Sequence, residues 1–154
     1  MSTQQHLIIA IPSFNDWMAI AKLLLLIDEV NWTEQKLSVE VLIIDDFSSE
    51  PLPNFLTSQD YRQIREVNIL RLLRNLGHQR AIAIGLCYID QYLNCDLVVV
   101  MDGDGEDSPF EIERLIQASQ QNHYQKIVFA KRNKRSENQT FKVFYFFYQK
   151  LYQV

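Results

Sequence analysis

Cysteine is scarce in this sequence, and its scarcity excludes several kinds of site. The two cysteines, Cys87 and Cys95, are too far apart for a CxxC redox or zinc motif. Neither stands beside a histidine at metal-ligand spacing. We therefore expect two reduced thiols, as in a protein of the cytoplasm.

Positive charge is also in short supply. The chain has 15 Lys and Arg residues against 19 Asp and Glu residues, which gives a net charge of −4 at pH 7. Binding along a nucleic-acid backbone needs an excess of basic residues on one face. The charge balance therefore predicts no nucleic-acid partner, although one local basic run lies at residues 131–135.

Long apolar runs are absent as well. No uncharged apolar stretch reaches the length of about 18 residues that a membrane-spanning helix requires. The first residues do not form a basic segment followed by an apolar one, which is the pattern of a secretion signal. The sequence predicts neither a signal peptide nor a membrane span.

The composition that remains is that of a globular protein. Hydrophobic residues make up 47% and charged residues 22% of the 154 positions, and no internal repeat or low-complexity tract interrupts them. A core of this size buries roughly two thirds of the surface that the unfolded chain exposes. We expect a single domain that spans residues 1–154.

Apolar periodicity predicts strands that alternate with helices. Strands are expected at residues 7–11, 39–44, 67–73, 97–101 and 127–130. Helices are expected at 16–30 and 108–120, and a third is expected to start at the turn 75–78 and to run to about residue 93. Residues 47–60 are rich in Ser, Pro and Asn and are predicted to form a loop. This alternation predicts an α/β fold with a mainly parallel sheet flanked by helices.

Polar residues follow four of these predicted strands. In an open parallel sheet, ligands bind beyond the carboxyl ends of the strands, where loops and helix N-termini meet. Four such clusters at one edge are better explained by a shared site than by chance. The clusters are Pro12-Ser-Phe-Asn-Asp16, Asp45-Asp46, Arg74-Asn75 and Asp102-Gly103-Asp104.

The segment Asp102-Gly-Asp-Gly-Glu106 carries the strongest chemical signal. Two carboxylates two residues apart repel each other unless a cation lies between them, and Mg²⁺ or Mn²⁺ prefers carboxylate and phosphate oxygens. Gly103 and Gly105 lack the side-chain bulk that would keep a diphosphate from the backbone. A plain turn is the alternative, because Asp and Gly are common in turns. A calcium loop is disfavoured, because Asp107 stands where such a loop requires Gly.

Other polar residues have two interpretations each. Asp45 and Asp46 either form a turn with the following serines or accept hydrogen bonds from a nucleotide base or ribose. Arg132 is either a solvated surface charge or a guanidinium that donates paired hydrogen bonds to a diphosphate. His78 and His123 have no partner His or Cys nearby, so we interpret them as surface or helix-start residues.

Taken in order, these motifs resemble the family 2 glycosyltransferases of the GT-A fold, and among them the polyprenyl-phosphate sugar transferases of the dolichyl-phosphate mannose synthase group. The resemblance covers about residues 7–150. It is carried by Ile11-Pro-Ser-Phe-Asn-Asp16, Ile43-Ile-Asp-Asp-Phe-Ser48, Leu73-Arg-Asn-Leu-Gly-His-Gln79, Val99-Val-Met-Asp-Gly-Asp-Gly-Glu-Asp-Ser-Pro109 and Val128-Phe-Ala-Lys-Arg132.

The resemblance implies a GT-A (Rossmann-like) domain, its N-terminal nucleotide-binding part, that holds a nucleotide-diphosphate sugar. It implies that Asp102 and Asp104 bind Mg²⁺ or Mn²⁺, with Glu106 at a third metal-side position. The residues that it places around the nucleotide sugar are Pro12, Phe14, Asn15, Asp16, Asp45, Asp46, Asn75, Gly77, Gln79, Asp102, Gly103 and Arg132.

The resemblance further implies an inverting transfer of the sugar, with a polyprenyl phosphate at the cytoplasmic face of the membrane as acceptor. The sequence departs from the family pattern at Asp16, where Glu is usual, and at Phe47, where Gly is usual. The family's acceptor side and catalytic base would lie beyond Val154, so we expect a truncated chain whose catalytic residues are unknown. A nucleotidyltransferase and a non-catalytic binding module remain alternatives.

The last fifteen residues form a separate pattern. Residues 140–154 are predicted to form a helix that is aromatic nearly all round. Such a helix must be covered, either by further polypeptide or by a membrane interface.

Overall fold

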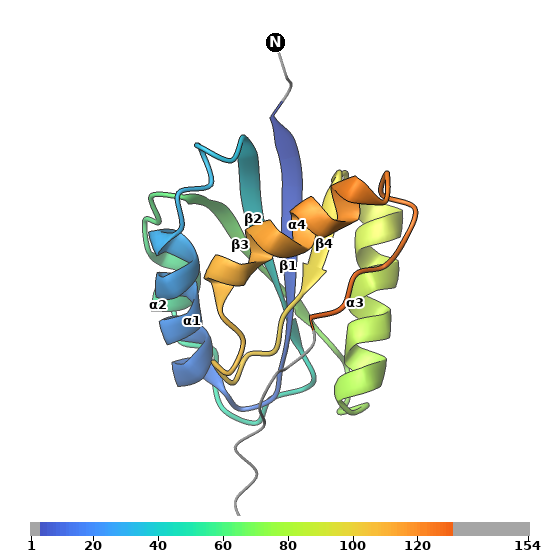
Figure 1. Cartoon of the computed structure of the whole chain (residues 1–154). Coiled ribbons are helices and arrows are strands. Elements are labelled where there is room, and N and C mark those ends of the chain that lie inside the picture. The colour runs from blue at the N-terminus through green and yellow to red at the C-terminus, as the bar shows by residue number, and fades with distance from the viewer. Residues whose placement is uncertain (1–3, 131–154) are drawn as a thin grey trace, which may run out of the picture. The chain divides into compact units, whose positions relative to one another are not determined.

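The computed structural model describes residues 4–130 (Figure 1). The chain divides into two compact units, Met1–Ile116 and Gln117–Val154. The elements in chain order are β1 (Gln5–Ser13), α1 (Trp17–Glu29), β2 (Leu37–Asp45), α2 (Phe55–Ser58), β3 (Ile64–Arg71), α3 (His78–Tyr92), β4 (Leu97–Val100), the 3-10 helix η1 (Pro109–Glu111) and α4 (Ile112–Gln121).

The four strands form one parallel sheet in the order β3-β2-β1-β4, which confirms the predicted fold class. From β1 the chain moves outward through β2 to β3, and then returns through α3 to place β4 on the other side of β1. The strand order therefore reverses between β1 and β4. In doubly wound sheets such a reversal opens a crevice at the carboxyl ends of the two strands.

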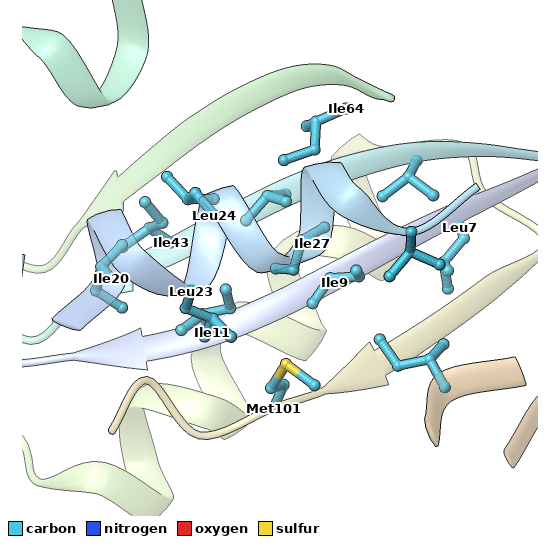
Figure 2. Packing of buried hydrophobic residues seen from close by; sticks show 14 of the residues in the cluster. Leu7, Ile9, Ile11, Ile20, Leu23, Leu24, Ile27, Ile43, Ile64 and Met101 are labelled. Atoms are coloured by element: carbon cyan, nitrogen blue, oxygen red, sulfur yellow. The ribbon is translucent and has the colours of Figure 1, made fainter. Parts of the chain in front are cut away.

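One face of the sheet packs against α1. Side chains of β1 alternate between the two faces, because successive residues of a strand point in opposite directions. Figure 2 shows Ile9 and Ile11 of β1 against Leu23 and Ile27 of α1, and all four are buried. Burial of each such side chain contributes about 1.5–3 kcal/mol, so this layer holds the first helix firmly on the sheet.

The opposite face packs against α3, which Figure 1 shows on the other side of the sheet from α1. Here Ile8 and Ala10 of β1 meet Ala81 and Ile89 of α3. Gly85 lies where α3 comes closest to the sheet, and a Cβ atom there would stand 2.7 Å from Cγ1 of Ile44. The close approach fixes the height of α3 above the sheet and thereby the position of its first turn.

Three sequence predictions differ from the structure. Residues 127–130 form no strand; Ile127 and Phe129 are 83% and 84% exposed, and no partner strand pairs with this short run in the described part of the chain. The predicted loop 47–60 contains α2, because Leu56 is fully buried and fixes one helical turn. β3 begins at Ile64 instead of Val67, since Ile64 also joins the core.

Two predictions lie outside the described residues. They are the aromatic helix at 140–154 and the position of Arg132. The single domain over residues 1–154 stays a prediction for the same reason. No helix among residues 4–130 is both long enough and apolar enough to cross a membrane.

Candidate functional site

A cavity of about 380 Å³ lies at the carboxyl ends of β1 and β4, where the strand order reverses. It is bordered by the end of β1, the loop before α3 and the loop after β4. Nine of the predicted site residues line it. They are Pro12, Phe14, Asp16, Asp46, Asn75, Gly77, Asp102, Gly103 and Asp104.

Asp46 connects three segments at the base of this cavity. Its side chain is buried, and its two carboxylate oxygens accept the N–H groups of Leu76 at 2.7 Å and Gly77 at 2.8 Å. Its own N–H donates to the carbonyl oxygen of Ser13 at 2.8 Å. The residue therefore ties the end of β2 both to β1 and to the start of α3. Gly77 has φ +85°, a left-handed conformation that glycine adopts without steric cost.

Asp45 performs a different task. Its carboxylate is 1% exposed, accepts the N–H of Ser48 at 2.8 Å and lies 3.5 Å from Nε of Arg71. Asp45 does not line the cavity. The turn-forming interpretation of the Asp-Asp-Phe-Ser segment thus describes Asp45, whereas Asp46 both shapes the loop and borders the cavity.

Asn15 braces the loops instead of lining the cavity. It has φ +58°, and its side-chain oxygen accepts the N–H groups of Ser49 at 2.8 Å and Glu50 at 3.1 Å. Its N–H donates to Oγ of Ser48 at 2.8 Å. Asn15 therefore holds the loop after β2 against the loop after β1.

Gln79 is exposed in the first turn of α3 and does not line the cavity either. Consecutive helical residues are turned about 100° from one another, so Gln79 does not share a helix face with its neighbour His78, which lines the cavity. Neighbouring positions in a helical motif therefore do not share a face.

The Asp102-Gly103-Asp104 turn leaves β4 directly into the cavity. Gly103 is buried, and a Cβ atom there would lie 2.7 Å from Cδ1 of Ile20 and 3.3 Å from Cγ2 of Ile11, so a larger residue requires the Ile20 side chain to shift. Oδ1 of Asp104 accepts the N–H of Glu106 at 2.9 Å, and Gly105 follows with φ +79°. The turn is thus built to leave two carboxylates at the cavity wall.

The donor set fits a divalent cation in part. Asp102 and Asp104 both line the cavity, but Glu106 is exposed and lies off it. Within residues 4–130, no three His, Cys, Asp or Glu side chains gather as metal ligands. Mg²⁺ is commonly held by one or two carboxylates together with substrate phosphates, and two carboxylates meet that requirement. The predicted third position at Glu106 is not supported by this geometry.

Two cavity residues were not identified from the sequence. His78 is the first residue of α3, and its Nε2 lies 3.4 Å from Oδ1 of Asp102. Ser13 ends β1, and its hydroxyl oxygen is buried without a hydrogen-bond partner among residues 4–130. His78 has no metal-ligand spacing in the sequence, because its neighbour Asp102 is distant in the chain and close only in the fold.

Known proteins resemble this chain in sequence. A 4-deoxy-4-formamido-L-arabinose transferase of Klebsiella pneumoniae (strain 342), named for undecaprenyl phosphate, is 29% identical over 115 residues, which are 75% of this chain and 34% of the relative. The uncharacterized glycosyltransferase YkcC of Bacillus subtilis (strain 168) is 29% identical over 142 residues, which are 92% of this chain and 42% of YkcC. The chain spans about a third of the length of the first of these relatives.

Solved structures share the fold. The solved chain of S. aureus TarS 1-349 superposes with a TM-score of 0.54 at 19% identity, covering 85% of this chain and 39% of the solved chain. A second structure, of TarS 1-349 in complex with UDP-GlcNAc, gives a TM-score of 0.54 at 18% identity over 85% of this chain and 37% of that solved chain. The family model described as Glycosyl transferase family 2 matches residues 8–153. The predicted family is therefore confirmed: the chain belongs to glycosyl transferase family 2.

Proposed function

We propose that this chain binds a nucleotide-diphosphate sugar and takes part in the transfer of its sugar to a polyprenyl phosphate. The observation that carries the proposal is the cavity at the strand reversal, where Asp102 and Asp104 face a space bordered by Pro12 and Asp46. Membership of the family supports a glycosyltransferase, and the relatives named for undecaprenyl phosphate support a lipid-phosphate acceptor.

The nucleotide end of the donor is proposed to lie between the loops after β1 and β2. Phe14 lines the cavity with about half of its side-chain surface exposed, so its ring offers an apolar face to a base. TarS, which shares the fold, has been solved with UDP and with UDP-GlcNAc. Uridine diphosphate sugars are therefore the first donors to test, and guanosine diphosphate sugars the second.

The diphosphate is proposed to lie against the Asp102-Gly103-Asp104 turn. Mg²⁺ or Mn²⁺, held by the carboxylates of Asp102 and Asp104, would neutralise the charge of the diphosphate as it leaves. Asp46 keeps the loop before α3 in place through the N–H groups of Leu76 and Gly77, so the cavity is shaped before a ligand arrives. Such preorganisation lowers the cost of positioning the donor.

The transfer is proposed to invert the configuration at C1 of the sugar. An oxygen of the acceptor phosphate forms the new bond to C1 from one face, while the bond from C1 to the diphosphate breaks on the other and the electron pair departs with the diphosphate. A phosphate oxygen is already ionised at neutral pH, so little help from a general base is required. Positioning and electrostatic stabilisation then supply most of the rate. This acceptor would place the reaction at the cytoplasmic face of a membrane.

Calorimetric titration tests the donor site directly. The full chain is titrated with UDP-sugars and GDP-sugars, once with Mn²⁺ and once with EDTA. We expect binding of at least one donor that is stronger with Mn²⁺, and we expect Asp102→Asn to remove the difference. A protein that binds none of these donors under either condition would contradict the proposal. Radiolabelled donor with undecaprenyl phosphate in detergent then tests transfer.

A further inference from the structure

The charge around the cavity is one-sided. Four of its lining residues are carboxylates, at Asp16, Asp46, Asp102 and Asp104. A diphosphate in the same space adds further negative charge, and at short range like charges repel strongly in a partly desolvated site. Among the described residues that line the cavity, His78 alone has a side chain able to carry positive charge.

The imidazole of His78 lines the cavity, where it could contact a phosphate oxygen of a bound ligand. Its side chain is about half exposed, and its contact with Asp102 is long at 3.4 Å, so a ligand can take its place at little cost. The imidazole projects from the first residue of α3, a helix of fifteen residues. A neutral imidazole already donates one N–H, so no change of protonation is needed.

The first turn of α3 adds to this environment. Its N-cap residue, Gly77, has no side chain that could cap the helix, and none of the residues of the first turn is acidic. The N–H groups at a helix start and the positive end of its dipole both favour an anion. Because Asp46 holds the N–H of Gly77, the direction of this helix end is fixed toward the cavity that Gly77, His78 and Ala81 line.

Ser13 gives an independent sign that the cavity takes a hydrogen-bonding ligand. The residue lines the cavity and is 5% exposed, and its hydroxyl oxygen is buried without a partner in the described part of the chain. Buried hydroxyl groups in folded proteins are nearly always hydrogen-bonded. A polar ligand in the cavity would supply the hydrogen-bond partner that the Ser13 hydroxyl lacks among the described residues.

We propose that His78 and the first turn of α3 form a subsite for the diphosphate of the donor, in which the imidazole of His78 donates a hydrogen bond to a phosphate oxygen. This inference rests on the proposed function, since it assumes a nucleoside diphosphate in the cavity. His78 and the start of α3 would then stabilise part of the negative charge of the diphosphate. This contribution would be separate from that of any metal held by Asp102 and Asp104.

The test compares ligands with and without phosphates. Chemical-shift titrations of the full chain measure the Kd of UDP, GDP, uridine and guanosine for the wild type, His78→Ala and His78→Gln, each with Mg²⁺ and with EDTA. Gln91→Ala is the matched control, because Gln91 is exposed on the same helix and does not line the candidate cavity. Thermal unfolding of each variant confirms that it folds.

We expect His78→Ala to weaken binding of the nucleoside diphosphate about tenfold, the usual effect of losing one hydrogen bond to a charged group. The loss should be similar with Mg²⁺ and with EDTA, while the nucleoside without phosphates changes by less than about twofold. His78→Gln keeps an N–H donor and should retain part of the affinity. Gln91→Ala should match the wild type.

Three results would overturn the subsite. Equal losses for nucleoside and diphosphate would show that His78 acts on the shape of the cavity. A loss seen only with Mg²⁺ would show that it acts through Asp102. An unchanged diphosphate affinity would exclude the contact altogether. A wild type that binds neither UDP nor GDP would instead overturn the donor site, and the subsite with it.

Discussion

Asp46 and Gly77 are joined by a hydrogen bond of 2.8 Å from the N–H of Gly77 to Oδ2 of Asp46, across 31 residues of chain. The other carboxylate oxygen accepts the N–H of Leu76 at 2.7 Å. One side chain thereby links the end of β2 to the start of α3. The candidate site consequently depends on a structural carboxylate as well as on those that would meet a ligand.

Asp46→Asn tests that link. An amide has one acceptor oxygen and an NH₂ group, so one of the two N–H groups at Leu76 and Gly77 loses its acceptor and meets a donor instead. Both N–H groups are part-buried, and that of Gly77 also donates to Oδ1 of Asn75 at 3.2 Å. We therefore expect a loss of about 1 kcal/mol of unfolding free energy, the low end of the range for a buried N–H without an acceptor. Urea unfolding followed by circular dichroism measures it.

Asp90→Asn is the matched control for this substitution, because Asp90 is exposed on α3. Its urea midpoint should agree with that of the wild type. If Asp46→Asn unfolds at the wild-type midpoint as well, the two hydrogen bonds do not stabilise the loop, and the preorganised cavity would need another explanation.

Gly85 allows a second test, of the contact between α3 and the sheet. A Cβ atom at this position would overlap the side chain of Ile44. Gly85→Ala adds helix propensity of about 1 kcal/mol, but overpacking of a close helix–sheet contact costs about 1–3 kcal/mol. We expect a net loss of stability, measured by urea unfolding.

A double-mutant cycle separates the two effects. Ile44→Val removes Cδ1, the atom that would lie nearest to the new methyl group. In the Ile44→Val background, Gly85→Ala should therefore destabilise less than in the wild type, or stabilise. Equal costs in both backgrounds would mean that Ile44 is not the group that restricts position 85.

The parallel sheet could be predicted from the sequence because its strands are continuous apolar runs. Leu7–Ile11 is fully buried, whereas Leu97–Val100 packs only Leu97 and Val99 on the core. The carboxyl ends of the two strands meet at one edge, as the strand pattern requires. The same rule predicted that Asp46 and Asp102 share a site, and both line one cavity. Both predictions rest on local sequence patterns, namely apolar runs and the polar residues that follow them.

The remaining features depend on tertiary structure. The contact of His78 with Asp102 exists because α3 crosses back to β4, which no local pattern encodes. Asn15 and Phe47 both have positive φ, at +58° and +65°, although neither is glycine. Phe47 stands where the family pattern has Gly, and its ring lies 5.9 Å from the guanidinium carbon of Arg71. The sequence shows that Phe47 replaces the usual Gly, but not that Phe47 adopts the positive φ that Gly favours.

The two cysteines should differ in reactivity. Burial raises the pKa of the Cys95 thiol, and the nearby charges of Asp96 and Glu40 raise it further. Cys87 is exposed on α3. Because the thiolate is the reactive form, we expect iodoacetamide to label Cys87 well before Cys95 at neutral pH. Peptide mapping by mass spectrometry measures both rates.

The raised pKa also fixes the sign of a stability effect. The unfolded chain loses the Cys95 proton at a lower pH than the folded chain does, so this thiol favours unfolding as pH rises through its ordinary value toward the folded one. The decline should be smaller in Cys95→Ser, while Cys87→Ser should behave as the wild type does. Labelling of Cys95 as fast as Cys87 would contradict the assignment.

Asp104 and Glu106 provide the sharpest test of the metal hypothesis. The sequence motif places both on the metal side, but only Asp104 lines the cavity, while Glu106 is exposed and donates its N–H to Oδ1 of Asp104. Carboxylates hold Mg²⁺ or Mn²⁺ only when their oxygens reach the ion directly or through one water. Asp104→Asn should therefore weaken Mn²⁺ binding in the presence of UDP about tenfold or more, as expected for the loss of one charged ligand. Glu106→Gln keeps the backbone N–H and should change the Mn²⁺ affinity less than about twofold.

Electron paramagnetic resonance of free Mn²⁺ measures the Mn²⁺ affinity of both variants. If Glu106→Gln weakens the ion as much as Asp104→Asn does, the turn must rearrange on binding so that Glu106 enters the site, and the two-carboxylate arrangement would be wrong.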